Sequence, residues 1–71
     1  MHSYEKGVQS YQQGNFTLAI QQLTSAIEAD PTHKAAYNDR GTAFKKVHQY
    51  QSAIQDYSSA ISLDPSYSIA F

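Results

Sequence analysis

Cysteine is absent from the 71 residues of this chain, which excludes disulfides, thiolate metal sites and cysteine nucleophiles. Charged residues are scarce, at 15% against a usual share of about 25%. The formal net charge is −1, so the chain has no general electrostatic attraction for nucleic acid or for anionic membranes. We therefore expect neither nucleic acid nor a membrane as a partner, and no cofactor.

Long apolar runs are also missing. None approaches the roughly 20 residues that a membrane-spanning helix requires. The first residues lack the basic start and apolar middle of a signal peptide, so we expect a cytoplasmic, intracellular protein. The length allows one small domain, which we place at 1–71.

The chain does contain an internal repeat with a spacing of 34 residues. Setting each residue against the one 34 positions later gives 37 pairs, of which ten are identical, among them Gly7/Gly41 and Pro31/Pro65. A fixed period of this length is typical of repeat architectures, in which one supersecondary unit stacks on the next. We place the first repeat at about 1–33, the second at about 34–67 and the start of a third at 68–71.

Within each repeat the apolar spacing is helical, and no strand pattern occurs. Short connections predict antiparallel helical hairpins. Thr32 and Ser66, which follow Asp-Pro pairs, are expected to cap the next helices with their hydroxyls. Gly14 predicts a left-handed turn, and His48 replaces glycine at the matching position. The predicted helices span roughly 2–13, 17–29, 34–47 and 51–63, with a short further helix from about 66.

Most conspicuous residues are expected to form the core. Gly7 and Gly41 would let the two helices of each hairpin approach closely, against small partners in the second helices. Larger side chains would then fill the space between hairpins. The small partners are Ala19, Ala26, Ala53 and Ala60, and the larger residues are Phe16, Leu23, Ile27, Tyr50, Tyr57 and Ile61.

Enzymatic patterns are poor, and we expect no enzyme. Ser3-x-x-Lys6 matches the short nucleophile motif of penicillin-binding enzymes, but the companion motifs are missing. The three histidines lack the i, i+4 spacing of a helical metal site, so no metal site is expected. The Lys45-Lys46 pair is too small for a nucleic-acid footprint.

The repeat resembles the tetratricopeptide repeat family over essentially the whole chain. In the first unit Ser3 and Ser10 stand where the motif has large residues, and Leu23 replaces an aromatic. The resemblance implies an all-α fold, an α-solenoid of stacked antiparallel helical hairpins that forms a right-handed superhelix. The second unit carries the motif closely, in Tyr37, Arg40, Gly41, Phe44, Tyr50, Ala53, Tyr57, Ala60, Asp64 and Pro65.

The same resemblance implies a scaffold module that binds a protein or peptide in a concave groove lined by the first helix of each hairpin. Tyr4, Val8 and Tyr11 would form an apolar strip in that groove, although Tyr4 and Tyr11 could equally cover a weakened first-helix core. Positions matching the groove of the family are Tyr4, Glu5, Val8, Tyr11, Gln12, Asn38, Asp39, Thr42, Lys45 and Lys46.

One subclass of the family clamps the carboxyl terminus of chaperone partners with Lys and Asn. Tyr4, Val8 and Asp39 occupy those places here, so chaperone-tail binding is not expected.

An alternative function from another class is structural, a unit that stacks on copies of itself without a peptide ligand. It rests on an uncovered apolar face at the end of the second hairpin. Tyr57, Ile61 and Leu63 would be partly exposed there, beside an apolar tail formed by Ile69 and Phe71.

Overall fold

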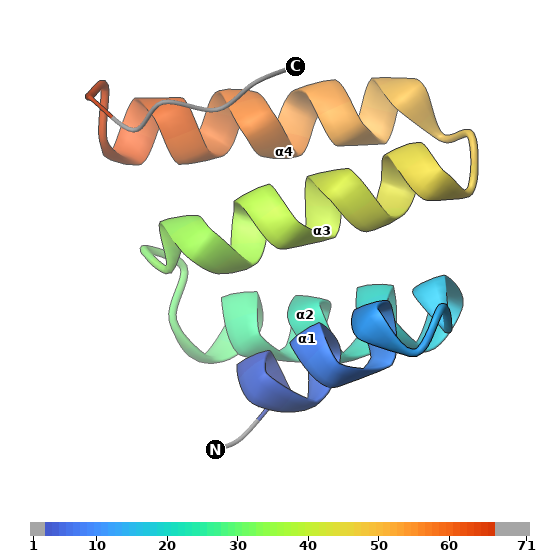
Figure 1. Cartoon of the computed structure of the whole chain (residues 1–71). Coiled ribbons are helices and arrows are strands. Elements are labelled where there is room, and N and C mark those ends of the chain that lie inside the picture. The colour runs from blue at the N-terminus through green and yellow to red at the C-terminus, as the bar shows by residue number, and fades with distance from the viewer. Residues whose placement is uncertain (1–2, 67–71) are drawn as a thin grey trace.

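The computed structural model describes residues 3–66, which form two stacked antiparallel helical hairpins (Figure 1). The first hairpin contains α1 (Ser3–Gln12) and α2 (Phe16–Ala29), and the second contains α3 (Lys34–Lys46) and α4 (Tyr50–Leu63). The predicted all-α fold of stacked hairpins is confirmed, with each predicted helix end correct to within one residue. The further helix expected from about residue 66 lies outside the described residues. Within 3–66, no helix is long and apolar enough to cross a membrane.

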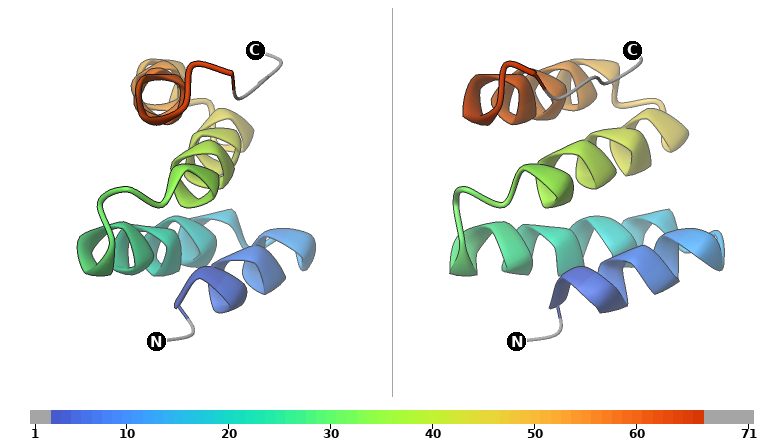
Figure 2. Two further views of the ribbon diagram at one scale, coloured as in Figure 1. Left: turned by 90° about the vertical axis from the view of Figure 1, so that its left-hand side faces the viewer. Right: turned by 60° about the vertical axis from the view of Figure 1, so that its left-hand side comes forward.

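The helices form two columns, with α1 and α3 on one side and α2 and α4 on the other (Figure 2). Helix α3 occupies the middle of the stack, because it packs on its hairpin partner α4 and also on α2 of the preceding hairpin. The first helices of both hairpins therefore share one face of the molecule.

The two turns inside the hairpins have the same left-handed backbone. Gly14 has φ = 82°, and His48, 34 positions later, has φ = 66°, so the prediction of a left-handed residue at both places is confirmed. Asn15 N–H donates to the Ser10 carbonyl at 2.8 Å, and Gln49 N–H donates to the Phe44 carbonyl at 2.9 Å. This six-residue closure is the Schellman motif, which satisfies carbonyls at the end of the first helix and reverses the chain.

The expected cap of α3 by Thr32 was wrong, and the helix that Ser66 was expected to cap lies outside the described residues. Thr32 donates its hydroxyl to the Asp30 carboxylate at 2.6 Å, and Ser66 donates to Asp64 at 2.7 Å, so both hydroxyls bind the preceding turn. Because α3 begins at Lys34, Thr32 lies one residue before the N-cap position. The N-cap of α3 is instead His33, whose Nδ1 accepts the Ala36 N–H at 3.2 Å.

The Asp64 carboxylate also joins the end of α4 to the start of α3. Lys34 Nζ lies 2.5 Å from Asp64 Oδ2. The hydrogen bond from Lys34, followed by the bonds from Ser66, lowers the pKa of Asp64 to about 2.

Close helix contact inside each hairpin depends on the two glycines, as predicted. A Cβ at Gly7 would lie 2.6 Å from Leu23 Cγ, and a Cβ at Gly41 would lie 3.1 Å from the Ala53 carbonyl oxygen. In the first hairpin the glycine thus faces a leucine rather than an alanine. Ser10, at the position of Phe44, is only 5% exposed and donates to Gln22 Oε1 at 2.8 Å.

The core is built largely from the small residues that the repeat predicted. Of the six predicted larger residues, only Leu23, Ile27 and Tyr57 are buried. Phe16 and Ile61 are half-buried, and Tyr50 is 53% exposed, as is the nearby Ile54 at 55%. The physical reason is that α4 ends the described stack, so none of the described helices packs on its outer face. Buried residues are Ala19, Leu23, Ala26, Ile27, Ala36, Ala43, Ala53, Tyr57 and Ala60.

The expectation of partial exposure was wrong for Tyr57 and correct for Leu63 and Ile61. Tyr57 is 4% exposed because its ring packs at Gly41 of its own hairpin. Leu63 is 41% exposed, and Ile61 is half-buried. The tail residues Ile69 and Phe71 lie outside the described residues.

We predict that His48→Gly raises the melting temperature. The left-handed backbone costs a residue with a side chain about 1 kcal/mol, which corresponds to roughly 4–8 °C in a domain of this size. The exposed contact of 2.9 Å between His48 Nδ1 and Tyr50 Oη offsets part of that gain. His48→Ala, which keeps the strain and loses the ring, is the matched control and should lower the melting temperature in circular dichroism. A lower value for His48→Gly would show that the Tyr50 contact outweighs the strain.

Candidate functional site

Two adjoining hollows lie along the face that α1 and α3 share. The first has a volume of about 210 Å³ and the second about 390 Å³, and both are lined by Tyr11 and Thr42. We call the pair the α1–α3 groove. Its first hollow is completed by Val8, Gln12 and Asp39, and its second by Lys45, Lys46, His48 and Tyr50.

Seven of the ten residues proposed from the sequence line this groove. Glu5 is exposed on α1, and Asn38 contributes its carbonyl oxygen, which accepts a hydrogen bond from Thr42 Oγ1 at 3.0 Å. His48 and Tyr50 line the second hollow and were not proposed as groove residues. From the sequence, His48 is expected in a turn and Tyr50 in the core.

Tyr4 does not line the groove and instead supports it. Its ring packs against the cluster of Ala26, Ile27 and Ala36, and its centroid lies 4.5 Å from that of His33. The Tyr4 hydroxyl donates to Asp39 Oδ2 at 2.7 Å, across from α1 to α3. Of the two roles left open by the sequence, the structure therefore places Tyr4 over the core.

Tyr11 lies at the junction of the two hollows. Its half-buried ring contacts Phe16 edge-on, with centroids 5.2 Å apart. Desolvation by burial, followed by the nearby Tyr57 and Asp39, raises the pKa of Tyr11, so its phenol stays neutral at physiological pH. The hydroxyl makes no hydrogen bond to any of residues 3–66. Tyr11 thus presents an apolar ring and an available polar group to the groove.

Thr42 is held in the groove by a buried hydrogen bond beneath it. Because Thr42 Oγ1 donates to the Asn38 carbonyl, it accepts from Tyr57 Oη, which lies 2.9 Å away. Tyr57 comes from α4, so the second helix of the hairpin fixes the groove wall from behind. Sequence reasoning assigned Tyr57 to packing alone, since a pairing 15 residues apart has no local pattern.

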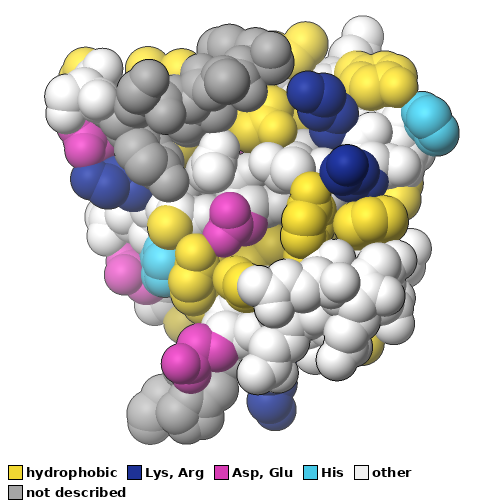
Figure 3. All heavy atoms as spheres, viewed as in Figure 1, with side chains coloured by type: hydrophobic (Ala, Val, Ile, Leu, Met, Phe, Trp, Pro, Cys, Tyr) yellow, Lys and Arg dark blue, Asp and Glu magenta, His cyan; other side chains and the backbone are white. Residues whose placement is uncertain are grey.

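Charges are distributed unevenly along the groove. Lys34 is paired with Asp64 and Arg40 with Asp56, whereas Lys45 and Lys46 meet no carboxylate within the described part of the chain. The Asp39 carboxylate lies in the first hollow and the two lysines in the second. Figure 3 shows apolar side chains around a central depression of this face, with an acidic side chain beside it and basic side chains toward one end.

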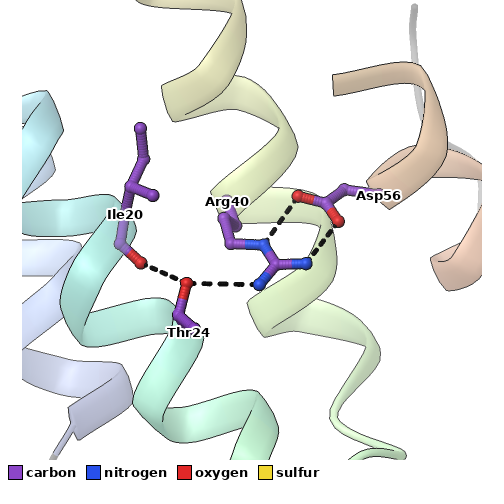
Figure 4. Close-up of polar contacts among 4 residues, drawn as sticks. All are labelled: Ile20, Thr24, Arg40 and Asp56. Carbon is purple, nitrogen blue, oxygen red and sulfur yellow. Dashed lines mark hydrogen bonds and ion pairs between the residues drawn. The ribbon is translucent and has the colours of Figure 1, made fainter. Parts of the chain in front are cut away.

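A buried charge pair holds the α3 wall of the groove in place (Figure 4). Arg40 donates to both Asp56 oxygens, from Nε at 2.8 Å and from one terminal nitrogen at 2.6 Å. The other terminal nitrogen donates to Thr24 Oγ1 at 3.2 Å, and Thr24 in turn donates to the Ile20 carbonyl at 2.7 Å. The network therefore joins α2, α3 and α4.

The guanidinium is well shielded and remains charged. The exposed side-chain fractions are 19% for Arg40 and 6% for Asp56, and the hydrogen bond to Asp56 raises the pKa of Arg40. The rings of Tyr37 and Phe44 lie 5.8 and 5.7 Å from the guanidinium carbon. The sequence placed Arg40 in a motif but did not identify Asp56, because the first repeat has Gln22 there.

Comparison with known proteins agrees with this architecture. Residues 35–67 match the family described as tetratricopeptide repeat, a range that coincides with the second predicted repeat. The chain is also similar to Hsp70-Hsp90 organizing protein 1 of Arabidopsis thaliana, with 38% identity over 48 residues. That alignment covers 68% of this chain and 8% of the relative, so the chain spans a small part of the relative's length.

We predict that Asp56→Ala lowers the free energy of unfolding by about 3–5 kcal/mol, because it leaves the Arg40 charge buried and unpaired. The double variant Arg40→Met/Asp56→Leu should lose less unfolding free energy than Asp56→Ala alone, because it leaves no unpaired charge. Lys34→Ala, which breaks the more exposed pair with Asp64, is the control and should cost much less than Asp56→Ala. Urea unfolding followed by circular dichroism measures all three. Equal losses of unfolding free energy for Asp56→Ala and Lys34→Ala would show that the Arg40–Asp56 pair contributes no more to stability than the exposed pair does.

Proposed function

This chain belongs to the tetratricopeptide-repeat family, and from that premise we propose that its α1–α3 groove binds a segment of a partner protein. The observation that carries the proposal is the first hollow, about 210 Å³ in volume, which collects Val8, Tyr11, Gln12, Asp39 and Thr42 from two helices. Five of the ten groove positions proposed from the sequence line this hollow together, which supports the proposal.

The chemistry of the hollow favours an apolar side chain flanked by polar backbone. Val8 and the Tyr11 ring offer apolar surface, while Thr42 and Gln12 offer hydrogen-bonding groups at the rim. A half-buried tyrosine provides large contact area at a low cost in conformational entropy, which is common at binding hot spots. Two hairpins offer limited area, so we expect weak binding of an extended or helical peptide.

The matched relative bears on the partner only by analogy. Its name describes a protein that organises Hsp70 and Hsp90. At the clamp positions this chain has an apolar Val8 and a negative Asp39, and Tyr4 already donates to Asp39. We therefore propose a protein partner and a non-catalytic role, but not capture of a chaperone carboxyl terminus. A cytoplasmic location stays a prediction of the sequence.

We predict that Tyr11→Ala weakens binding of groove-selected peptides about tenfold, a loss of about 1.4 kcal/mol that exceeds the roughly 1 kcal/mol below which most interface truncations fall. The probes are peptides selected with the unmodified chain from a random library, with affinities measured by fluorescence anisotropy. Leu18→Ala is the control, since Leu18 is 38% exposed on α2 and lines neither hollow. Helicity should stay close to that of the unmodified chain in both variants. If Tyr11→Ala unfolds the protein, Tyr11 is a core residue and the site is misassigned.

Self-assembly is the second candidate function, and the outer side of α4 favours it. Tyr50, Ile54 and Leu63 are among the large apolar residues that are more than a third exposed, and all three belong to α4. Exposed apolar groups gathered on one element are a common site of association.

We predict that the 71-residue chain associates as its concentration rises, and that Ile54→Lys suppresses the association. A lysine at this exposed position places a charge in the contact without altering the buried core. Sedimentation measurements over a wide concentration range give the mass directly. Leu18→Lys, on α2, is the control and should associate as the unmodified chain does. A folded monomer at every concentration would exclude this candidate.

A further inference from the structure

The two hollows of the α1–α3 groove differ in the sign of the charges that line them. Lys45 and Lys46 lie at one end with Tyr11, His48 and Tyr50, whereas Asp39 lies in the first hollow. Lys45 and Lys46 have no carboxylate partner among residues 3–66, in contrast to Lys34 and Arg40. A ligand that crosses both hollows therefore contacts apolar side chains in the first hollow. In the second hollow it meets two positive charges that have no carboxylate partner among the described residues.

We propose that the partner segment carries an acidic side chain two residues from a large apolar side chain, and that Lys45 and Lys46 select the acidic one. This inference rests on the proposed peptide-binding function. The apolar side chain occupies the hollow between Val8, Tyr11 and Thr42. The acidic side chain enters the second hollow, where the lysines provide charge complementarity.

The spacing follows from helix geometry. Along α3, the midpoint between Asp39 and Thr42 precedes the midpoint of the Lys45–Lys46 pair by five residues, or about 7.5 Å at 1.5 Å per residue. An extended peptide advances about 3.3 Å per residue, so two residues cover nearly the same distance. Side chains two residues apart point to the same side of an extended chain, as entry into two adjoining hollows requires.

The charge at Asp39 sets the position of the acidic side chain. An acidic side chain in the first hollow would lie beside the Asp39 carboxylate, which already accepts the Tyr4 hydroxyl. In the second hollow the same side chain would meet Lys45 and Lys46 instead. The last turn of α3 also favours cations through the helix dipole, but that effect acts on any cation there and does not require a ligand.

The test is a selection from a random library of octapeptides with acetylated amino ends and amidated carboxyl ends, so that only side chains supply carboxylates. The full chain is the bait, and the readout is the sequence profile of the retained peptides. We expect Asp or Glu two residues from a large apolar residue to be enriched by up to about fivefold, the upper limit for an exposed ion pair. Raising the salt concentration should reduce this enrichment.

Two variants with the same change in net charge separate local selection from general electrostatics. Lys45→Gln/Lys46→Gln removes the charges of the second hollow, and Lys6→Glu changes the net charge equally at an exposed α1 position that lines neither hollow. The acidic enrichment should vanish in the double variant and persist in Lys6→Glu, with unchanged circular dichroism in both.

The outcomes distinguish this inference from the function on which it rests. Retained peptides with an apolar preference but no acidic one would overturn the inference and leave the binding function intact. Acidic enrichment that survives in Lys45→Gln/Lys46→Gln would overturn it as well. A parallel library has free carboxyl ends. If peptides are selected for a carboxylate in that library alone, the groove recognises a chain terminus and not an acidic side chain, which would overturn the inference. If no peptide is retained, the peptide-binding function itself fails, and the inference with it.

Discussion

The position of α3 depends on one buried ion pair. Arg40 makes two hydrogen bonds to Asp56 of α4 and a third to Thr24 of α2, so a single side chain ties the second hairpin together and binds it to the first. Breaking such a pair from one side costs about 3–5 kcal/mol, a large fraction of the stability of a domain this small. Since α3 forms one wall of the groove, this pair helps to hold the groove in shape.

In the first hairpin, Lys6 stands at the position of Arg40 and is exposed, and a contact between neutral groups is found near it in the sequence. At the positions of Phe44 and Asp56 this hairpin has Ser10 and Gln22, whose side chains hydrogen-bond to one another at 2.8 Å. Gly7 allows α1 to lie directly on Leu23, as Gly41 allows α3 to lie on α4. The departures from the repeat pattern in the first unit therefore form a paired polar contact and do not loosen the hairpin.

The core contains many small side chains, and large aromatic side chains lie around it and line the groove. Glycine and alanine occupy much of the helix crossings, and three tyrosines take different places around them. Tyr4 covers the core and holds Asp39, Tyr57 is buried and holds Thr42, and Tyr11 remains over the hollows. Three tyrosines thus have three roles, although each side chain has the same chemistry.

Local information in the sequence determined the two-hairpin architecture. Helical periodicity, the 34-residue repeat and the residues at Gly14 and His48 act over a few positions, so the helices and turns follow from the sequence directly. Tertiary structure decided the rest, because Tyr4–Asp39, Arg40–Asp56 and Thr42–Tyr57 join residues 35, 16 and 15 positions apart. Whether such pairs meet depends on how two helices cross, which no short pattern encodes. The same reason explains why the sequence could name seven lining residues of the groove and yet miss its buried supports.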